Sequence, residues 1–203
     1  QEMALKAGAC ASKHKCTDAE LKTFARENAD SLPGKLGQFA RAFGGADKDI
    51  EKAKALTIGD PTNPNTYLGP LARQSQLTYL NQQLNDAKEK KATIALDGRQ
   101  HSCDTGWFFA PSVVLNTNHQ MKLMTEESFG PIIGIQKVAH DDEAIHQMNG
   151  TPLGLTASVH STSKERATHI LSQINAGTVY WNTCDRVSPY VPWSGRKHSG
   201  VGS

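Results

Sequence analysis

The chain of 203 residues predicts an α/β fold, with an open, mostly parallel sheet flanked by helices. From residue 59 onward, short runs rich in β-branched and aromatic residues alternate with longer stretches of helical period. Glycine, proline, asparagine and aspartate separate these runs, as they do at turns. Helical stretches of about 10–15 residues between strands are typical of the crossover connections that parallel sheets require.

The first part of the chain is predicted to be helical throughout, and the sequence leaves its relation to the rest of the chain open. A capping box at Thr17-Asp18-Ala19-Glu20 predicts the start of a first helix. The apolar spacing predicts further helices over residues 36–43 and 47–56. We therefore divide the chain into a helical segment, residues 1–58, and an α/β part, residues 59–203.

The α/β part is predicted from its local patterns. Leu77, Leu80 and Leu84 place one apolar stripe on the longest helix. Pro111 favours an edge position or a bulge for its strand, because proline cannot donate to a sheet. In chain order we expect helix 74–90, strands 93–96, 108–115 and 132–138, helix 141–148, strand 155–160, helix 163–174 and strand 178–181.

Composition excludes several classes of protein. With 22 basic and 20 acidic residues the net charge is +2, which predicts no nucleic-acid partner. No window of 18 apolar residues and no secretory signal occur, so we expect no membrane span. The four cysteines are unevenly spaced, which indicates reduced thiols in a cytoplasmic protein and no metal site. Because residue 1 is glutamine, we expect that upstream sequence is missing.

Six sequence blocks carry a resemblance to a known family. Glu127-Ser128-Phe129-Gly130-Pro131 closely resembles the E-x-F-G-P signature of aldehyde dehydrogenases. The other blocks that match this family, in family order, are Gly59-Asp60-Pro61 with Gly69-Pro70, Gly106 to Pro111, Asn149 to Val159, Gly177 to Asn182, and Pro192 to Gly202. The resemblance covers about residues 57–203 and implies the C-terminal part of an aldehyde dehydrogenase catalytic domain.

The resemblance implies a cofactor, NAD or NADP, and two residues that contact it. The carboxylate of Glu127 would accept hydrogen bonds from the nicotinamide ribose hydroxyls, and Phe129 would pack beside the nicotinamide ring. The domain that holds the adenosine and pyrophosphate is expected to be absent from this chain. Without the other blocks, Glu127 would be interpreted as a surface carboxylate and Phe129 as a core residue. The glycines of the last block are expected to permit tight turns and close backbone packing.

The loop between Asn182 and Pro192 matches the segment that lines the aldehyde entrance in this family. Cys184, Arg186 and Val187 are therefore candidate substrate contacts, together with Thr183 and Asp185. The alternative is an ordinary solvated loop, and the sequence favours neither interpretation.

The family's cysteine nucleophile has no clear counterpart. Family spacing from Gly59 leads to Ala29 and Asp30, where no cysteine stands. Cys10 is our candidate, because Ala7-Gly8-Ala9-Cys10 resembles the family's nucleophile motif without its glutamine. Cys16 is a second candidate. Gly37-Gln38-Phe39-Ala40 instead places alanine where the cysteine belongs, which would prevent thiohemiacetal formation.

Three functions remain open from the sequence. The first is oxidation of a small-molecule aldehyde to a carboxylic acid through a cysteine thiohemiacetal and thioester, by a fragment of a longer enzyme. The second is a non-catalytic aldehyde dehydrogenase-like structural or assembly subunit, suggested by Ala40 and by the unfamiliar first 58 residues. The third is an unrelated α/β binding domain. Family members are usually dimers or tetramers, so a homo-oligomer is expected of the complete protein.

Overall fold

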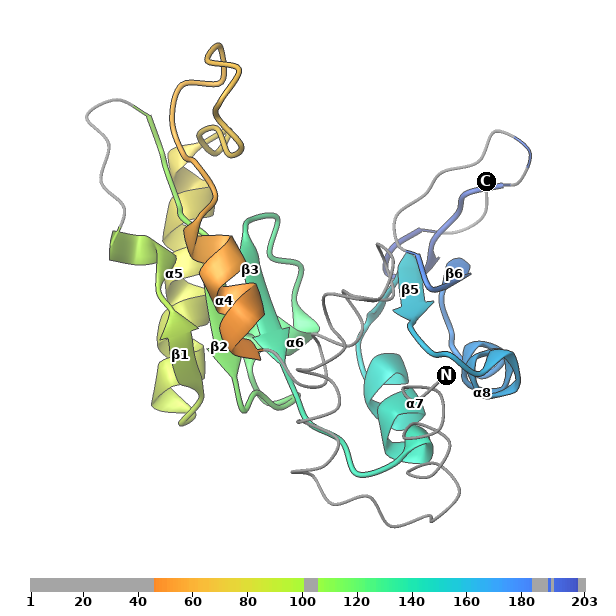
Figure 1. Ribbon diagram of the computed structural model, residues 1–203. Coiled ribbons are helices and arrows are strands. Elements are labelled where there is room, and N and C mark those ends of the chain that lie inside the picture. Colours follow the sequence, from red (N-terminus) through yellow and green to blue (C-terminus); the bar gives the residue numbers. More distant parts are fainter. Residues whose placement is uncertain (1–45, 101–105, 184–189, 191, 201–203) are drawn as a thin grey trace, which may run out of the picture. The chain divides into compact units, whose positions relative to one another are not determined.

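The computed structural model describes residues 46–100, 106–183, 190 and 192–200 (Figure 1). The chain divides into two compact units, residues 1–51 and residues 52–203. Of the first unit only the beginning of helix α4 (Ala46–Lys54) is described. The predicted helices before residue 46 lie outside the described residues. All other described elements belong to the second unit.

A three-stranded sheet forms the first core of the second unit. It contains β1 (Thr93–Leu96), β2 (Ser112–Leu115) and β3 (Ile132–Ile135), in the order β1-β2-β3. Strand β1 pairs antiparallel with β2, and β2 pairs parallel with β3. Helix α5 (Gln74–Glu89) lies along this sheet, as Figure 1 shows. The buried core comprises Leu80, Leu84, Ala87, Phe109, Val114, Met121 and Leu123.

The leucine stripe predicted on α5 explains this packing. Leu80 and Leu84 are fully buried, and Leu77 packs against the same cluster, so the apolar face of α5 covers the sheet. Between β2 and β3 the chain forms the short helix α6 (Lys122–Thr125). The backbone N–H of Lys122, at the start of α6, donates to the Asp86 carboxylate of α5 over 2.9 Å.

The C-terminal segment of the chain forms a second core. Helix α7 (Asp141–Asn149) and helix α8 (Lys164–Leu171) accompany the parallel pair β5 (Thr156–Val159) and β6 (Thr178–Trp181). The buried residues of this core are Ile145, Val159, Ala167, Ile170, Ile174 and Ala176. A separate two-stranded antiparallel sheet joins β4 (Leu153–Gly154) to β7 (Arg196–Lys197).

The α/β class is confirmed, and the described strands divide among three small sheets, of which one is mixed, one antiparallel and one parallel. The connections explain the directions. The pairs β2–β3 and β5–β6 are each joined through a helix and are parallel, because a parallel pair needs a crossover connection. The described residues between β1 and β2 contain only the short 3-10 helix η1 (Gly98–Gln100), and this pair is antiparallel.

Most predicted elements are confirmed with small shifts of their ends. Strands 93–96 and 178–181 have the predicted bounds, and α5 and α7 differ from prediction by one residue. The predicted strand 108–115 is too long, since β2 begins only after Pro111, which has no N–H to donate. Sequence reasoning missed α6, η1 and the two-residue strands β4 and β7, which are too short to show a period.

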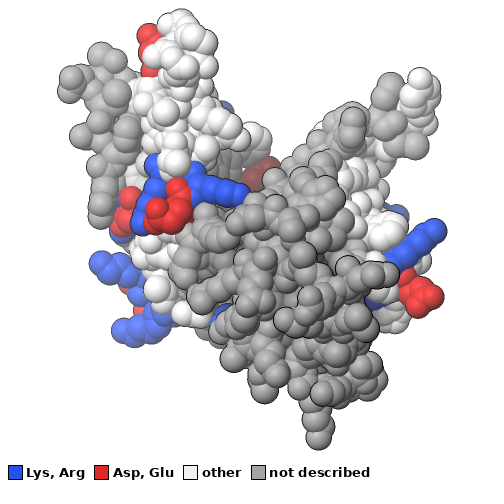
Figure 2. All heavy atoms as spheres, viewed as in Figure 1, with Lys and Arg blue, Asp and Glu red and all other residues white. Residues whose placement is uncertain are grey.

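Acidic and basic side chains of the described residues lie next to one another on the face shown in Figure 2, as expected from their nearly equal numbers. In the described part of the chain, every helix is too short or too polar to span a bilayer. The same residues contain no group of three or more His, Cys, Asp or Glu side chains that could hold a metal ion.

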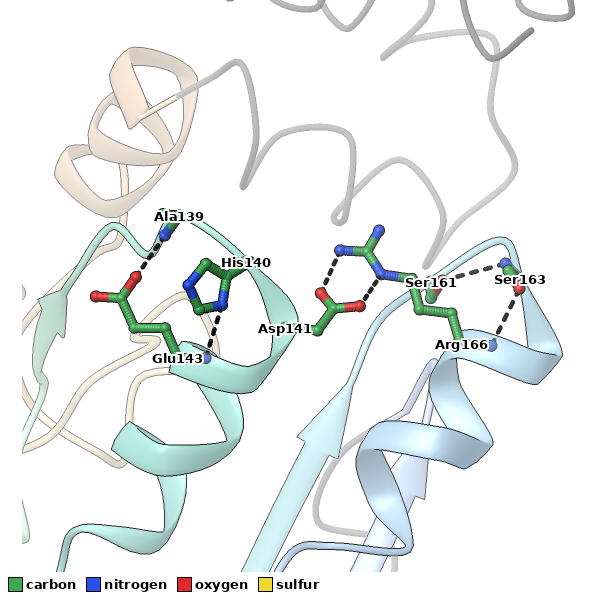
Figure 3. A network of polar contacts seen from close by, with 7 residues as sticks. All are labelled: Ala139, His140, Asp141, Glu143, Ser161, Ser163 and Arg166. Atoms are coloured by element: carbon green, nitrogen blue, oxygen red, sulfur yellow. Dashed lines mark hydrogen bonds and ion pairs between the residues drawn. The ribbon is translucent and has the colours of Figure 1, made fainter. Parts of the chain in front are cut away.

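An ion pair joins the beginnings of α7 and α8 (Figure 3). Arg166 donates to both oxygens of Asp141, over 2.7 Å from Nε and 2.5 Å from Nη2. Each helix also has a side-chain cap: His140 Nδ1 accepts the Glu143 N–H, and Ser163 Oγ accepts the Arg166 N–H. The guanidinium holds the pKa of the Asp141 carboxyl below its usual value, chiefly through these hydrogen bonds.

Asp141→Asn is expected to lower the free energy of unfolding at neutral pH by about 0.5 kcal/mol, since the pair is partly exposed and screened by solvent. Because the folded pKa is depressed, this stabilisation is present above the unfolded pKa of about 3.9 and is lost as pH falls through the folded pKa. Urea unfolding at several pH values would measure the difference. Asp142→Asn, at the exposed neighbouring carboxylate, is the control, and equal effects of the two variants would contradict the assignment.

Candidate functional site

The segment after α6 has an unusual backbone. Helix α6 is closed by the Glu126 N–H, which donates to the Lys122 carbonyl over 2.8 Å. Phe129 then adopts a left-handed conformation with φ of 47°, and its side chain is 76% exposed. Such a φ is uncommon for a bulky residue and is found where the surroundings impose it. Here the next residue, Gly130, is packed directly on Leu80, where a Cβ would overlap the leucine side chain.

The predicted turn at Gly130-Pro131 is present. The Ile132 N–H donates to the Gly130 carbonyl over 2.8 Å, which makes a tight turn into β3. The Pro131 carbonyl in turn accepts the Ser112 N–H over 2.8 Å and so joins the turn to β2. The conformation of the 126–131 segment is therefore fixed at its C-terminal end by the sheet.

Glu127 lines a cavity of about 460 Å³. The other walls come from three segments that are distant in sequence: residues 148–157, 174–176 and 198–199. A volume of this size is in the usual range for small-molecule sites, about 300–1,000 Å³. The 126–131 segment contributes to this cavity through Glu127 alone.

Lys197 brings two of the wall segments together. Its ammonium donates to the carbonyl of Asn149 over 2.9 Å and to that of Thr151 over 3.0 Å. The pairing of β4 with β7 sets Lys197 opposite Leu153, and Ser199 Oγ accepts the Gly154 N–H over 2.9 Å. The family-like blocks around residues 149–159 and 192–202 are thus joined by main-chain and side-chain hydrogen bonds.

Asn149 joins two of the segments that line the cavity, residues 148–157 and residues 174–176. Its side-chain amide donates to the Gln173 carbonyl and accepts the Asn175 N–H, both over 2.8 Å. The Gly177 N–H donates to the Gly154 carbonyl over 2.9 Å. The stretch from Gln173 to Gly177 is therefore held near its beginning by Asn149, at the end of α7, and at its end by Gly154 of β4.

Glycines permit these close approaches, as the sequence predicted for those of the last block. A Cβ at Gly177 would overlap the Ser194 carbonyl oxygen, and one at Gly195 would overlap that of Ser199. Gly200 has φ of 136°, a conformation that side chains rarely allow. The glycines at 195 and 200 thus serve close packing and turning of the backbone.

The predicted site residues differ in where the structure places them, and several are not described. Glu127 is exposed on the cavity wall and makes no hydrogen bond or ion pair to another described residue. Phe129 is not among the residues that line this cavity. Thr183 is described, and its carbonyl accepts the Ser158 hydroxyl. The other candidates lie outside the described residues: Cys10, Cys16, Ala40, Cys184, Asp185, Arg186 and Val187.

Sequence reasoning missed most of the cavity wall. Leu155, Asn175, His198 and Ser199 were within recognised blocks or beside them, but no role was assigned to them. Their membership of those blocks was the available signal. The cavity combines a free carboxylate with leucine and isoleucine side chains and with polar groups. It can therefore accept hydrogen bonds from a hydroxylated ligand and cover an apolar ring.

Comparison with known proteins identifies the family. Residues 46–203 match the family model described as "Aldehyde dehydrogenase family". The chain therefore belongs to the aldehyde dehydrogenase family, which confirms the resemblance and excludes the unrelated α/β binding domain.

Curated relatives agree. Succinate-semialdehyde dehydrogenase (NADP(+)) 1 of Mycobacterium ulcerans is 36% identical over 156 residues, covering 77% of this chain and 34% of the relative. An aldehyde dehydrogenase of Emericella nidulans is 35% identical over 152 residues, covering 75% and 30%. The chain spans about a third of the length of these relatives.

Solved structures agree as well. Betaine aldehyde dehydrogenase of Staphylococcus aureus in complex with NAD+ superposes with a TM-score of 0.71 at 29% identity, over 75% of this chain and 31% of that one. An aldehyde dehydrogenase of Mycobacterium tuberculosis complexed with NAD+ gives 0.74 at 29% identity, over 80% and 34%.

Gly177→Ala is expected to destabilise the fold by about 3 kcal/mol or more, because the new methyl group would meet a backbone carbonyl that cannot rotate away. Gly59→Ala is the matched control, since a Cβ there would lie 3.5 Å from Thr66 Oγ1, an ordinary contact. Its cost should stay below about 1 kcal/mol. Chemical denaturation of both variants measures the difference, and equal small costs would refute the close approach of residues 177 and 194.

Proposed function

We propose that this chain forms the nicotinamide-facing part of an NAD(P)-dependent enzyme that oxidises an aldehyde to a carboxylic acid. The observation that supports the proposal is the position of Glu127, a carboxylate without a protein partner among the described residues, on the wall of a ligand-sized cavity. Family membership supplies the reaction class, and the cavity supplies a place for one half of the cofactor.

The residues of the cavity fit a nicotinamide riboside. The Glu127 carboxylate can accept both ribose hydroxyls, while Leu153 and Leu155 offer apolar surface to a flat ring. Phe129 does not line the cavity, and its packing beside the nicotinamide ring is proposed from the family resemblance and from its exposed side chain. When bound, the nicotinamide accepts the hydride of the oxidation. Relatives named for NADP and structures holding NAD+ both occur, so either cofactor is proposed.

The proposed chemistry needs a nucleophile and a substrate pocket from the same chain. The Cys10 thiolate would attack the aldehyde carbon to form a thiohemiacetal. Loss of hydride leaves a thioester, and water hydrolyses it to the carboxylic acid and the free thiol. Cys184, Arg186 and Val187 are proposed to contact the aldehyde, and the Arg186 guanidinium would suit a substrate that carries a carboxylate.

The division of the chain, its assembly and its location in the cell are proposed as well. Residues 1–58 form a helical segment and residues 59–203 the portion that carries the catalytic-domain motifs. The protein acts on a small-molecule aldehyde, as a homo-oligomer in the cytoplasm.

In the complete protein of which this chain is expected to be a part, Cys10→Ser should abolish aldehyde-dependent formation of NADH or NADPH and remove the fastest iodoacetamide-reactive thiol, because an activated thiolate reacts fast near neutral pH. Cys103→Ser, at a thiol with no assigned role, should change neither. The substrate panel would include succinate semialdehyde and betaine aldehyde. Cofactor binding without turnover, and slow labelling of all four cysteines, would instead support the non-catalytic subunit.

Glu127→Gln should weaken binding of nicotinamide mononucleotide by about 10- to 100-fold, the loss expected for charge-assisted hydrogen bonds. This probe contains only the ribose and ring that the cavity would hold, with one phosphate, so its binding does not depend on an adenosine site. Ligand-observed NMR titration gives the affinity. Glu89→Gln, at the exposed end of α5, is the control. Unchanged affinity in the Glu127 variant would overturn the proposed role.

A further inference from the structure

One face of α5 holds the segment that carries Glu127. Gln76 donates from its side-chain amide to the Ser128 carbonyl. Tyr79 donates from its hydroxyl to Glu126 Oε2 over 2.7 Å. Positions 76 and 79 are three residues apart on a helix and so share a face. The two hydrogen bonds reach the residues on either side of Glu127.

The same helix continues to hold the chain on both sides of these contacts. Leu80, next to Tyr79, packs on Gly130 so closely that a Cβ there would overlap it. One to two turns further along α5, Asp86 accepts the Lys122 N–H at the start of α6 over 2.9 Å. Lys90 pairs with Asp86 over 2.6 Å and donates to the Gln120 carbonyl. The segment from Gln120 to Gly130 is thus anchored at intervals along one helix.

Glu127 stands apart from this pattern. Its neighbours Glu126 and Ser128 are each engaged by α5, whereas its own carboxylate makes no hydrogen bond or ion pair to a described residue and lines the cavity. Two adjacent glutamates therefore have different surroundings. One is bound to the helix, and the other is left available to a ligand.

We propose that Gln76 and Tyr79 are positioning residues for Glu127: by holding Ser128 and Glu126, they fix the direction in which the Glu127 carboxylate enters the cavity. The inference rests on the proposed function, because it concerns the affinity of that cavity for a ribose-bearing ligand. The orientation of the carboxylate matters for affinity. If the carboxylate must be reoriented when the ligand binds, the free-energy cost of ordering it weakens binding.

The protonation of Tyr79 is consistent with a donor role. The hydrogen bond to Glu126 raises the pKa of the Tyr79 hydroxyl above its usual value, and burial and the charges of Glu126 and Glu127 act in the same direction. The hydroxyl therefore keeps its proton across the neutral range and remains able to donate to Glu126.

The test combines two single substitutions on α5 with a matched control in the full chain. Tyr79→Phe removes only the hydroxyl, and Gln76→Met removes only the amide. Gln82→Met makes the same chemical change at an exposed glutamine of the same helix. Hydrogen–deuterium exchange of the amides from 126 to 132 reports the order of the segment, and nicotinamide mononucleotide titration reports its affinity.

Tyr79→Phe and Gln76→Met should each speed exchange of the 126–132 amides and weaken nucleotide binding by about three- to tenfold, the range expected for loss of one hydrogen bond that acts on the ligand indirectly. Gln82→Met should do neither. In a Glu127→Gln background the loss of affinity should vanish while the faster exchange remains, because the α5 residues act on the ligand only through Glu127. Glu126→Gln, which keeps an acceptor for Tyr79, should retain more affinity than Glu126→Leu.

Three results would overturn the inference, and they can be told apart. If Glu127→Gln weakens binding but Tyr79→Phe and Gln76→Met leave it at the wild-type value, the proposed function stands and the positioning role falls. The same holds if their losses of affinity add to that of Glu127→Gln. If Glu127→Gln itself leaves binding unchanged, the proposed function fails, and the positioning role fails with it.

Discussion

The backbone approach between Gly177 and Ser194 is the constraint on which the cavity depends. The two residues are far apart in the sequence. Their backbones can approach this closely only because residue 177 has no Cβ. Once they are adjacent, β4 can pair with β7, and Lys197 can reach the carbonyls that end α7. Hydrogen bonds that include main-chain groups therefore hold together three of the segments that line the cavity.

Glu127, the remaining part of the cavity wall, is carried by the other core, which contains the three-stranded sheet. Glu127 follows Glu126, the residue that closes α6, and the buried face of α5 holds this region against the three-stranded sheet. Leu80 has two consequences there: it is fully buried in the core, and it excludes any side chain from position 130. Packing of the core and anchoring of the segment that carries the carboxylate thus depend on the same helix.

The sequence predicted the elements whose patterns are long enough to have a period. The leucine stripe of α5 and the β-branched run of β6 indicated these two elements, with bounds correct to within one residue. The two-residue strands β4 and β7 could not be predicted, because they exist only through their pairing with each other across more than 40 residues of chain. The division of strands among three sheets also depends on such distant pairings.

The candidate site was predictable in part. Glu127 could be selected because the block around it resembles a family signature, and the structure places it on a cavity. The contacts of Gln76 and Tyr79 with its neighbours could not be selected, since nothing in a helical pattern indicates which loop will lie against that face. His198 and Ser199 were in a recognised block, but their place on the cavity wall results from the register of β4 with β7.

The nicotinamide ring is proposed to occupy the cavity beside Glu127, and every role assigned to the 126–131 segment depends on that position. Intermolecular nuclear Overhauser effects between bound nicotinamide mononucleotide and assigned leucine methyl groups test it most directly. We expect contacts from the ring protons to Leu153 and Leu155. Contacts instead to Leu56 and Leu96, which line a separate cavity of about 310 Å³, would contradict the proposed position.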